Sequence, residues 1–272
     1  MHSSIMHPLD IHWLYTFASV ALVAGLALVG RVALTLSSKL LSRAIPLLVS
    51  LAAGALLGTA FGHLLPESVE RIGNRRELSG LLIGGFLTFF VLEKLLSVWC
   101  NGTRHDHGGP VVHPPQGAHG RRSSTGHGPM VTNLLFGSAI HSILDGMSIA
   151  TGYSVGTHLG VLTTFAVLLH EVPHHIGDVS ILIHKGIPIV RAVGLSFLAG
   201  STAAVGALLV LLAGAQSTRV TTTLLPFATA NFVYIASANL LPELRHENRL
   251  RPSLVQIVFF GAGCTLMFVL GS

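Results

Sequence analysis

The sequence is poor in charged residues, cysteine and aromatic side chains. Only 10% of its 272 residues are Asp, Glu, Lys or Arg, 50% are hydrophobic, and the mean hydropathy is +0.68. A soluble domain of this length needs far more charge to cover its surface. The composition therefore excludes a soluble protein and indicates an integral membrane protein. Aromatic residues make up only 7%, and the apolar runs of about 20 residues predict spanning helices rather than a β-barrel.

The two cysteines, Cys100 and Cys264, exclude a disulfide framework and a cysteine-based metal site. The net charge of +5 does not indicate a nucleic-acid partner, because the basic residues lie at the ends of apolar runs rather than on one face. The first ten residues carry no basic leader or small-residue cleavage signal, so the first apolar run is expected to remain as a helix. The expected partner of the apolar surface of the protein is the lipid bilayer. A homodimer is a further possible assembly.

Eight apolar runs predict an all-α integral membrane protein with eight transmembrane helices. The predicted spans are residues 12–31, 44–65, 78–98, 131–152, 157–183, 189–214, 221–241 and 253–271. The segment between the third and fourth spans, residues 101–129, is rich in Gly, Pro and His and cannot build a core. We therefore expect three parts: helices 1–3 in residues 1–100, a disordered His-rich loop in 101–129, and helices 4–8 with the functional residues in 130–272.

The distribution of Lys and Arg predicts the orientation. With the N-terminus outside, the inner loops hold twelve basic residues and the outer loops hold four, so the positive-inside rule favours N-out and C-out, with the His-rich loop in the cytoplasm. The compact length favours a bacterial inner membrane, with an intracellular eukaryotic membrane as the alternative.

A weak internal repeat accompanies this topology. Residues 60–67 and 236–243 both end in Leu-Leu-Pro-Glu, and the predicted topology places the first ending outside and the second inside. Inverted repeats of this kind recur in transporters. The sequence thus predicts a 3+2+3 arrangement of helices with an inverted repeat.

Two carboxylates lie well inside apolar runs, at Asp145 in the fourth span and Glu171 in the fifth. A charge at this depth costs about 2.5–3.5 kcal/mol and therefore marks a functional site. His141 precedes Asp145 by four residues, and His170 and His174 flank Glu171, so at helical spacing these five side chains share one region. Imidazoles mixed with carboxylates suit Zn²⁺, and also Fe²⁺, Mn²⁺ or Cd²⁺. We interpret them as a metal site.

Further polar residues are candidates for a second site or for the metal pathway. His175 and Asp178 follow His174 on the fifth span, and His63 lies one turn from Glu67 at the outer end of the second span, where it is interpreted as a gate or relay. The loop histidines are expected to make weak contacts with metal because nothing orders them. They are His105, His107, His113, His119 and His127. The histidines near span ends are instead interpreted as interhelical hydrogen-bonding residues. They are His12, His158, His184 and His246.

Two backbone features of the spans also predict function. Pro173 cannot donate to the carbonyl of Leu169, which predicts a kink in the middle of the polar cluster. Glycines inside the spans permit close approach of helices, which sliding surfaces and static bundles both need. They are Gly25, Gly54, Gly58, Gly62, Gly84, Gly85, Gly194, Gly200 and Gly206.

The pair of motifs His141-Ser142-x-x-Asp145-Gly146 and His170-Glu171-x-Pro173-His174-His175-x-Gly177-Asp178 resembles the fourth- and fifth-helix signatures of the ZIP (Zrt-, Irt-like) divalent metal transporters. The similarity is greatest to the branch with an HExPH motif. It covers the whole chain, since the family also has eight helices, both termini outside, a variable His-rich loop after the third helix, and LLPE-type ends on the second and seventh.

The resemblance implies metal import toward the cytoplasm, with an elevator-like movement of one helix bundle against another proposed for the family. It implies a primary site of His141, Asp145, His170 and His174. It assigns a second, adjacent metal to Ser142, Glu171 and His174, but Ser142 stands where many relatives have Asn, and the sixth span lacks a carboxylate that some relatives carry. His175 also replaces a frequent Glu. We therefore expect one strong site and a weaker or transient second one.

Two other classes of protein share features with this sequence, an intramembrane zinc protease and a static haem or metal-sensing protein. His170-Glu171-x-x-His174 matches the HExxH motif of zinc proteases, and Leu144-Asp145-Gly146 resembles an element of intramembrane metalloproteases. In those enzymes the HExxH helix comes first, and a proline inside the motif would distort it. A static haem or metal-sensing protein is the other alternative, but the chain has no CxxCH sequence and no other sign of an organic cofactor. The sequence thus predicts a transporter of Zn²⁺, not an enzyme.

Overall fold

The computed structural model describes residues 8–26, 38–101, 128–213, 218–244 and 249–271. Within these ranges the chain is helical and contains no strand. The described part of each of the eight predicted spans is mainly helical. The end of the first span and the last residue of the sixth lie outside the described residues, as does most of the His-rich loop with its five histidines. Six helical stretches are long and apolar enough to cross a membrane. The chain is therefore an all-helical, multi-pass membrane protein.

The helices fall into two parts of the chain, before and after the His-rich loop. The first part forms α1 (Pro8–Gly25), α3 (Ser38–Thr59), the π-helix η1 (Ala60–Leu64), α4 (Leu65–Ile72) and α5 (Arg75–Asn101). The second part forms α6 (Gly128–Val155), α7 (Thr157–His184), α8 (Ile189–Ser201), α9 (Ala203–Leu212), α10 (Thr218–Tyr234), the π-helix η2 (Ile235–Leu240), α11 (Leu241–Leu244) and α12 (Leu250–Leu270). Asn101 and the two residues after 127 are helical, so the predicted loop 101–129 is slightly too long at both ends.

Two of these helices depart from a simple apolar span. α1 offers only a short apolar helix, Ile11–Gly25, within the described residues. α7 has 28 residues, which is long enough to span, but its histidines and carboxylates make it less apolar than the other spanning helices. It also continues as one helix through Pro173. The helix that carries most of the polar cluster is thus not among these six stretches.

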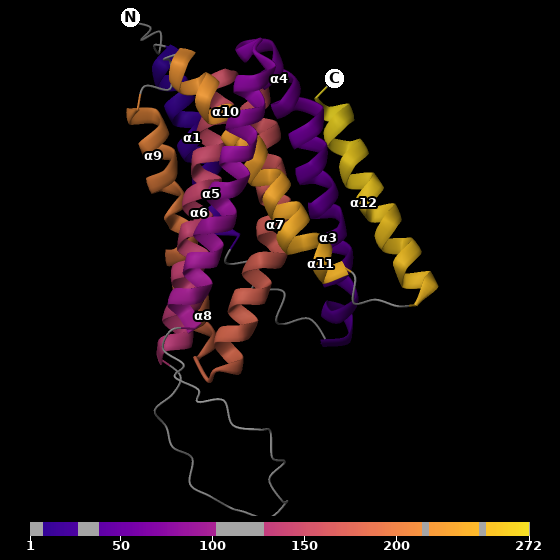
Figure 1. Ribbon diagram of the computed structural model, residues 1–272. Helices are drawn as coiled ribbons and strands as arrows, with labels where there is room; N and C mark the ends of the chain where they lie inside the picture. Colours follow the sequence, from indigo (N-terminus) through magenta and orange to yellow (C-terminus); the bar gives the residue numbers. More distant parts are fainter. Residues whose placement is uncertain (1–7, 27–37, 102–127, 214–217, 245–248, 272) are drawn as a thin grey trace, which may run out of the picture.

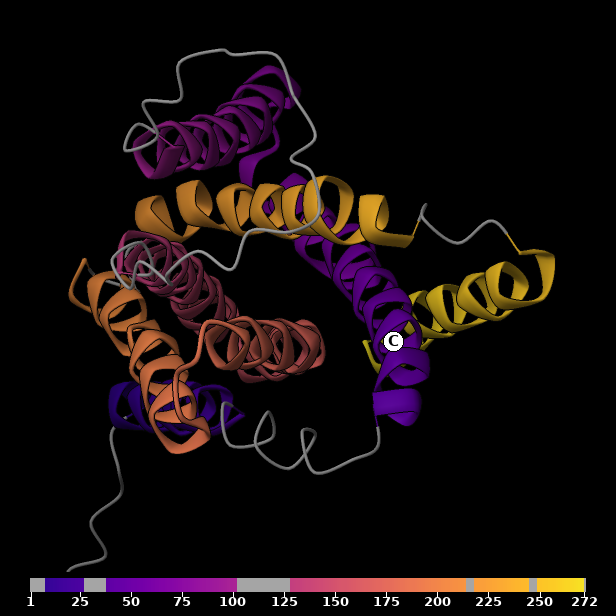
Figure 2. The ribbon, with the colours of Figure 1, turned by 90° about the horizontal axis from the view of Figure 1, so that it is seen from below.

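The helices pack as two groups. The α7 group contains α1, α6, α7, α8 and α9, and the α3 group contains α3, α4, α5, α10, α11 and α12 with both π-helices. Figure 2 shows the two groups side by side, with α7 against α3 and α6 against α10. Leu56 of α3, Ile149 of α6 and Phe232 of α10 are fully buried in one core where the groups meet. α1 begins and α12 ends at the same end of the molecule (Figure 1).

The two Leu-Leu-Pro-Glu segments have the same local structure. In each, a π-helix ends at the first leucine, at Leu64 and Leu240, and an α-helix begins at the second, with proline in its first turn. π-Helices are rare and usually mark functional sites. The two segments thus share a local structure as well as a short sequence.

Candidate metal centre

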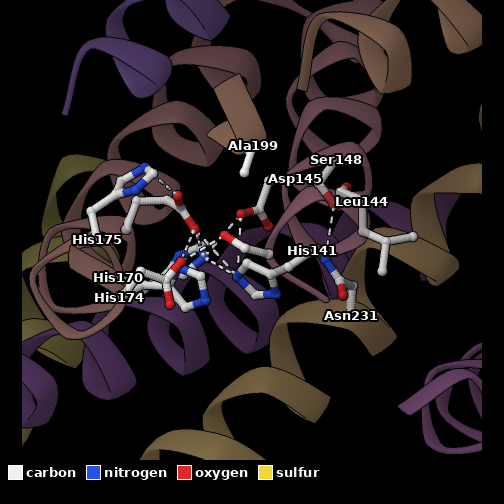
Figure 3. Close-up of polar contacts among 12 residues, drawn as sticks. His141, Leu144, Asp145, Ser148, His170, His174, His175, Ala199 and Asn231 are labelled. Atoms are coloured by element: carbon white, nitrogen blue, oxygen red, sulfur yellow. Dashed lines mark hydrogen bonds and ion pairs between the residues drawn. The ribbon is translucent and has the colours of Figure 1, made fainter. Parts of the chain in front are cut away.

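α6 and α7 form a close antiparallel hairpin that joins at Gly156. A Cβ at Gly152 would contact Thr163 and the backbone of Gly160 at less than ordinary distances, so glycine is needed for the approach near the turn. The close contact near the turn keeps the middle of α6 beside the middle of α7. The predicted residues of the two spans are thereby brought together, as Figure 3 shows.

Four side chains converge on one point between these helices. His170 Nε2 lies 3.1 Å from Asp145 Oδ2 and 3.3 Å from His141 Nε2. His141 Nε2 also lies 3.3 Å from Glu171 Oε1. Each of these four residues contributes one possible ligand atom, and these four atoms all lie within 4.8 Å of one another. Two ring nitrogens and two carboxylate oxygens at such distances suit a divalent transition metal.

Three of these four residues are buried where uncompensated charge is costly, and His141 is partly exposed. Asp145 is 0% exposed, and His170 and Glu171 are nearly as buried. Within the described residues, Asp145 Oδ1 and both oxygens of Glu171 have no hydrogen-bond partner. The groups nearest to the two carboxylates are imidazoles, which balance a buried negative charge only when they are protonated. A bound dication would supply the missing compensation.

A second group of donor atoms lies on the other side of Glu171. His175 Nε2 is 3.0 Å from Glu171 Oε2, and His174 Nδ1 is 4.0 Å from Glu171 Oε1. The two ring nitrogens are buried without a hydrogen-bond partner in the described part of the chain. His175 Nδ1 instead contacts Ser196 Oγ of α8, at 2.8 Å. A ring whose Nδ1–H donates to a hydroxyl presents the lone pair of Nε2 to a metal.

Asp178 lies beside these residues and is held by α6. Ser138 donates a hydrogen bond of 2.7 Å to Asp178 Oδ2, and the same oxygen lies 3.8 Å from His174 Nδ1. Ser138 therefore fixes Asp178, whose carboxylate lies near the His174 ring without a hydrogen bond to it. Sequence analysis missed Ser138 and Ser196. Ser138 had a signal, since it lies three residues before His141, whereas Ser196 had none.

Three other predicted residues do not join these groups. Ser142 is buried and its hydroxyl has no hydrogen-bond partner among the described residues, but it is not among the converging ligand atoms. His63 Nε2 contacts the carbonyl oxygen of Met267 at 2.7 Å. Glu67 is paired with Arg71, one turn away.

A cavity of about 750 Å³ leads from the cluster. His141, His170 and His174 line one wall, and residues of α3, α5, α10, η2 and α11 form the facing wall. That wall is mostly apolar but contributes five polar side chains. The sequence did not indicate that they face the metal cluster. They are Glu93, Asn231, Tyr234, Asn239 and Glu243. Tyr234 donates a hydrogen bond of 2.7 Å to Glu93, and Asn231 donates one of 3.3 Å to Ser148 of α6.

Comparison with known proteins identifies relatives over most of the chain. The family model of the ZIP zinc transporters matches residues 10–129 and 111–271. Zinc transporter YKE4 of Saccharomyces cerevisiae is 29% identical over 269 residues, which cover 91% of this chain and 74% of that protein. Zinc transporter ZIP13 of Mus musculus is 31% identical over 253 residues, covering 82% and 69%. A ZIP13 homolog of Drosophila melanogaster is 28% identical, covering 84% and 78%.

Proposed function

The chain belongs to the ZIP zinc transporter family, and from this membership we propose that it carries zinc across a membrane through the cluster between α6 and α7. The observation that carries the proposal is the convergence of His141, Asp145, His170 and Glu171, with unpaired carboxylate oxygens, at the inner end of a cavity. The chain is a transporter and not an enzyme. The relatives give no support to the protease alternative, and in this chain Asp145 precedes the HExxH sequence.

Zinc is the proposed substrate, and Fe²⁺, Mn²⁺ and Cd²⁺ are competitors that the same donor atoms would accept. The ion exchanges its hydration shell for imidazole and carboxylate ligands and is then released toward the cytoplasm. The cavity supplies the release route, since its walls carry carboxylates at Glu93 and Glu243 and amides at Asn231 and Asn239. Because imidazole must be neutral to bind metal, loading should weaken as the pH falls through the histidine range.

We propose that transport involves movement of the α7 group relative to the α3 group. Glycines with the tightest interhelical approaches lie within the groups: Gly54 and Gly58 of α3 against α12, and Gly146 and Gly206 between α6 and α9. Their backbone contacts would keep each group rigid. The metal ligands lie on α6 and α7 of one group, whereas the facing cavity wall belongs to the other. Displacement of one wall would then expose the ion to the opposite side.

The membrane topology follows from the same proposal. We place eight spans in the 3+2+3 order with both termini outside and the His-rich loop inside, as the basic residues favour. The relatives named above are eukaryotic. For this reason we favour an intracellular eukaryotic membrane over a bacterial inner membrane.

The first prediction concerns the metal. Proteoliposomes with the purified chain should take up radioactive zinc above the level of protein-free vesicles, and excess cadmium, iron(II) or manganese should reduce this uptake in the order in which the site prefers them. Zinc binding without any uptake would contradict transport and favour a static binding protein. Cleavage of a membrane substrate that disappears in Glu171→Gln would favour the protease.

The second prediction concerns a weaker second ion. We propose that Glu171, His174 and His175 bind it, because one ligand atom from each lies within 4.8 Å of the other two. Titration of the purified chain with cadmium should show a strong and a weak event. Ser196→Ala, which releases the His175 ring, should weaken only the second, by about tenfold. Ser201→Ala is the matched control on α8, because its hydroxyl bonds only to the carbonyl of Leu198 among the described residues. One binding event in the unmodified chain would refute the second site.

A further inference from the structure

Two histidines from different helices bind the end of α12. His63 Nε2 contacts the carbonyl oxygen of Met267 at 2.7 Å, and His158 Nε2 contacts that of Leu270 at 3.1 Å. A carbonyl oxygen only accepts, so each imidazole donates through Nε2–H. Both acceptors belong to the last turn of α12, where carbonyls lack N–H donors from their own helix. In a membrane protein such groups need a partner.

The two histidines differ in the part of the molecule that carries them. His63 lies in η1, which continues α3, and α3 packs along α12 through Gly54, Gly58 and Gly263. A Cβ at any of these glycines would overlap backbone atoms of the neighbouring helix. α3 and α12 therefore form one rigid pair, and the His63 bond lies inside it.

His158 belongs instead to the first turn of α7, the helix that carries His170, Glu171 and His174. α7 touches α12 at few positions, in contrast to the long contact between α12 and α3. The His158 contact joins the two helix groups at the end where α6 turns into α7. In Figure 1 the end of α12 lies at the top, together with the start of α1.

The cavity lies toward the opposite end of the same helices. Its wall includes Gly137 near the start of α6 and Ile181 near the end of α7, whereas His158 is at the start of α7. The metal cluster, twelve or more residues along α7 from His158, lies about 18 Å away along the helix axis by the rise of 1.5 Å per residue. The two helix groups are thus joined by the His158 contact at the start of α7, and the cavity lies between them near the end of α7.

We propose that His158 is a positioning residue for transport, whose bond to Leu270 holds α7 on α12 in the conformation with the cavity open and must be released when the metal site turns to the other side. His63 bonds to the same end of α12, and it keeps this bond in both conformations because α3 and α12 move together. This inference rests on the proposed transport function. It adds to that function a specific contact that belongs to one of the two conformations.

A crosslinking experiment separates the two histidines. Both natural cysteines are first replaced by serine, and cysteines are then introduced as His158→Cys/Leu270→Cys or, as the matched control, His63→Cys/Gly271→Cys. The control pair is close because a Cβ at Gly271 would fall on the His63 ring. A short, reducible bifunctional thiol reagent then joins each pair in proteoliposomes.

Crosslinking the 158/270 pair should reduce zinc uptake by at least about tenfold, with recovery after reduction, whereas the 63/271 crosslink should leave uptake unchanged. The locked 158/270 protein should still bind zinc, because its cluster is intact and the cavity is open. Unchanged uptake in the crosslinked 158/270 protein would overturn the inference, as would equal inhibition by both crosslinks. Absence of uptake before any crosslinking, in the unmodified chain as well, would instead count against the transport function itself.

Discussion

Zinc uptake into proteoliposomes is expected to fall to the level of protein-free vesicles when His170 and His174 are both replaced by alanine. His170 Nε2 lies at the centre of the first group of ligand atoms, within 3.6 Å of Asp145 Oδ2, His141 Nε2 and Glu171 Oε1. His174 takes part in the second group with Glu171. Loss of residues that only orient a ligand already costs about 10–100-fold in metal affinity, so loss of two ligands should cost more.

The control for this variant is His184→Ala. His184 is an exposed residue in the last turn of α7, away from both ligand groups, so its removal should leave zinc uptake near that of the unmodified chain. Zinc bound by the purified variants, measured by equilibrium dialysis, tells loss of the site from loss of movement. Full uptake by the His170→Ala/His174→Ala protein would show that the cluster between α6 and α7 is not on the transport route.

The spacing of charged and imidazole groups was enough to select candidates for the first group of converging side chains. A carboxylate inside an apolar span is unfavourable unless a cation or a hydrogen-bond donor compensates it, and helical periodicity then places His141 beside Asp145. In the structure these residues lie close to His170 and Glu171. That they bind a metal stays a prediction. The eight apolar runs likewise lie on helix, because length and hydropathy decide such elements.

The residues that face the cluster from the other group were not predictable in the same way. Asn231 and Tyr234 are common polar residues in an apolar helix, and nothing in their spacing relates them to α6. Their place depends on how α10 packs against α6, which is a tertiary contact. The π-helices were missed for a similar reason, since an extra residue in a helical turn leaves no change in composition.

The glycines show the same limit most clearly. No described atom lies within 4 Å of a Cβ added at Gly25, Gly84 or Gly194, whereas at Gly54 and Gly206 it would overlap a backbone carbonyl oxygen. All five occur in similar apolar surroundings in the sequence. The sequence therefore could not distinguish glycines at contacts between helices that move past each other from glycines at contacts between helices that stay packed. The structure assigns the tightest approaches to contacts inside each helix group.

Replacement of Gly206 by alanine is therefore expected to destabilise the protein and to disturb the metal site together. The new Cβ would overlap the carbonyl oxygen of Ile143, which lies on α6 between His141 and Asp145. Overpacking usually costs about 1–3 kcal/mol, against a gain of up to about 1 kcal/mol from the better helix propensity of alanine. Because backbone on both sides must give way, the cost should prevail. Heating the purified protein in detergent should give a midpoint several degrees lower.

The matched control is Gly194→Ala on α8, in the same predicted span, where an added Cβ meets nothing within 4 Å. Its melting temperature should stay equal or rise slightly, because only the propensity effect remains. Gly206→Ala should also bind zinc more weakly than Gly194→Ala in the fraction that remains folded, since α6 must shift at the position of its two ligands. Equal melting temperatures and equal zinc affinities would show that the α6–α9 seam yields easily, and would remove the main support for a rigid α7 group that moves as a unit.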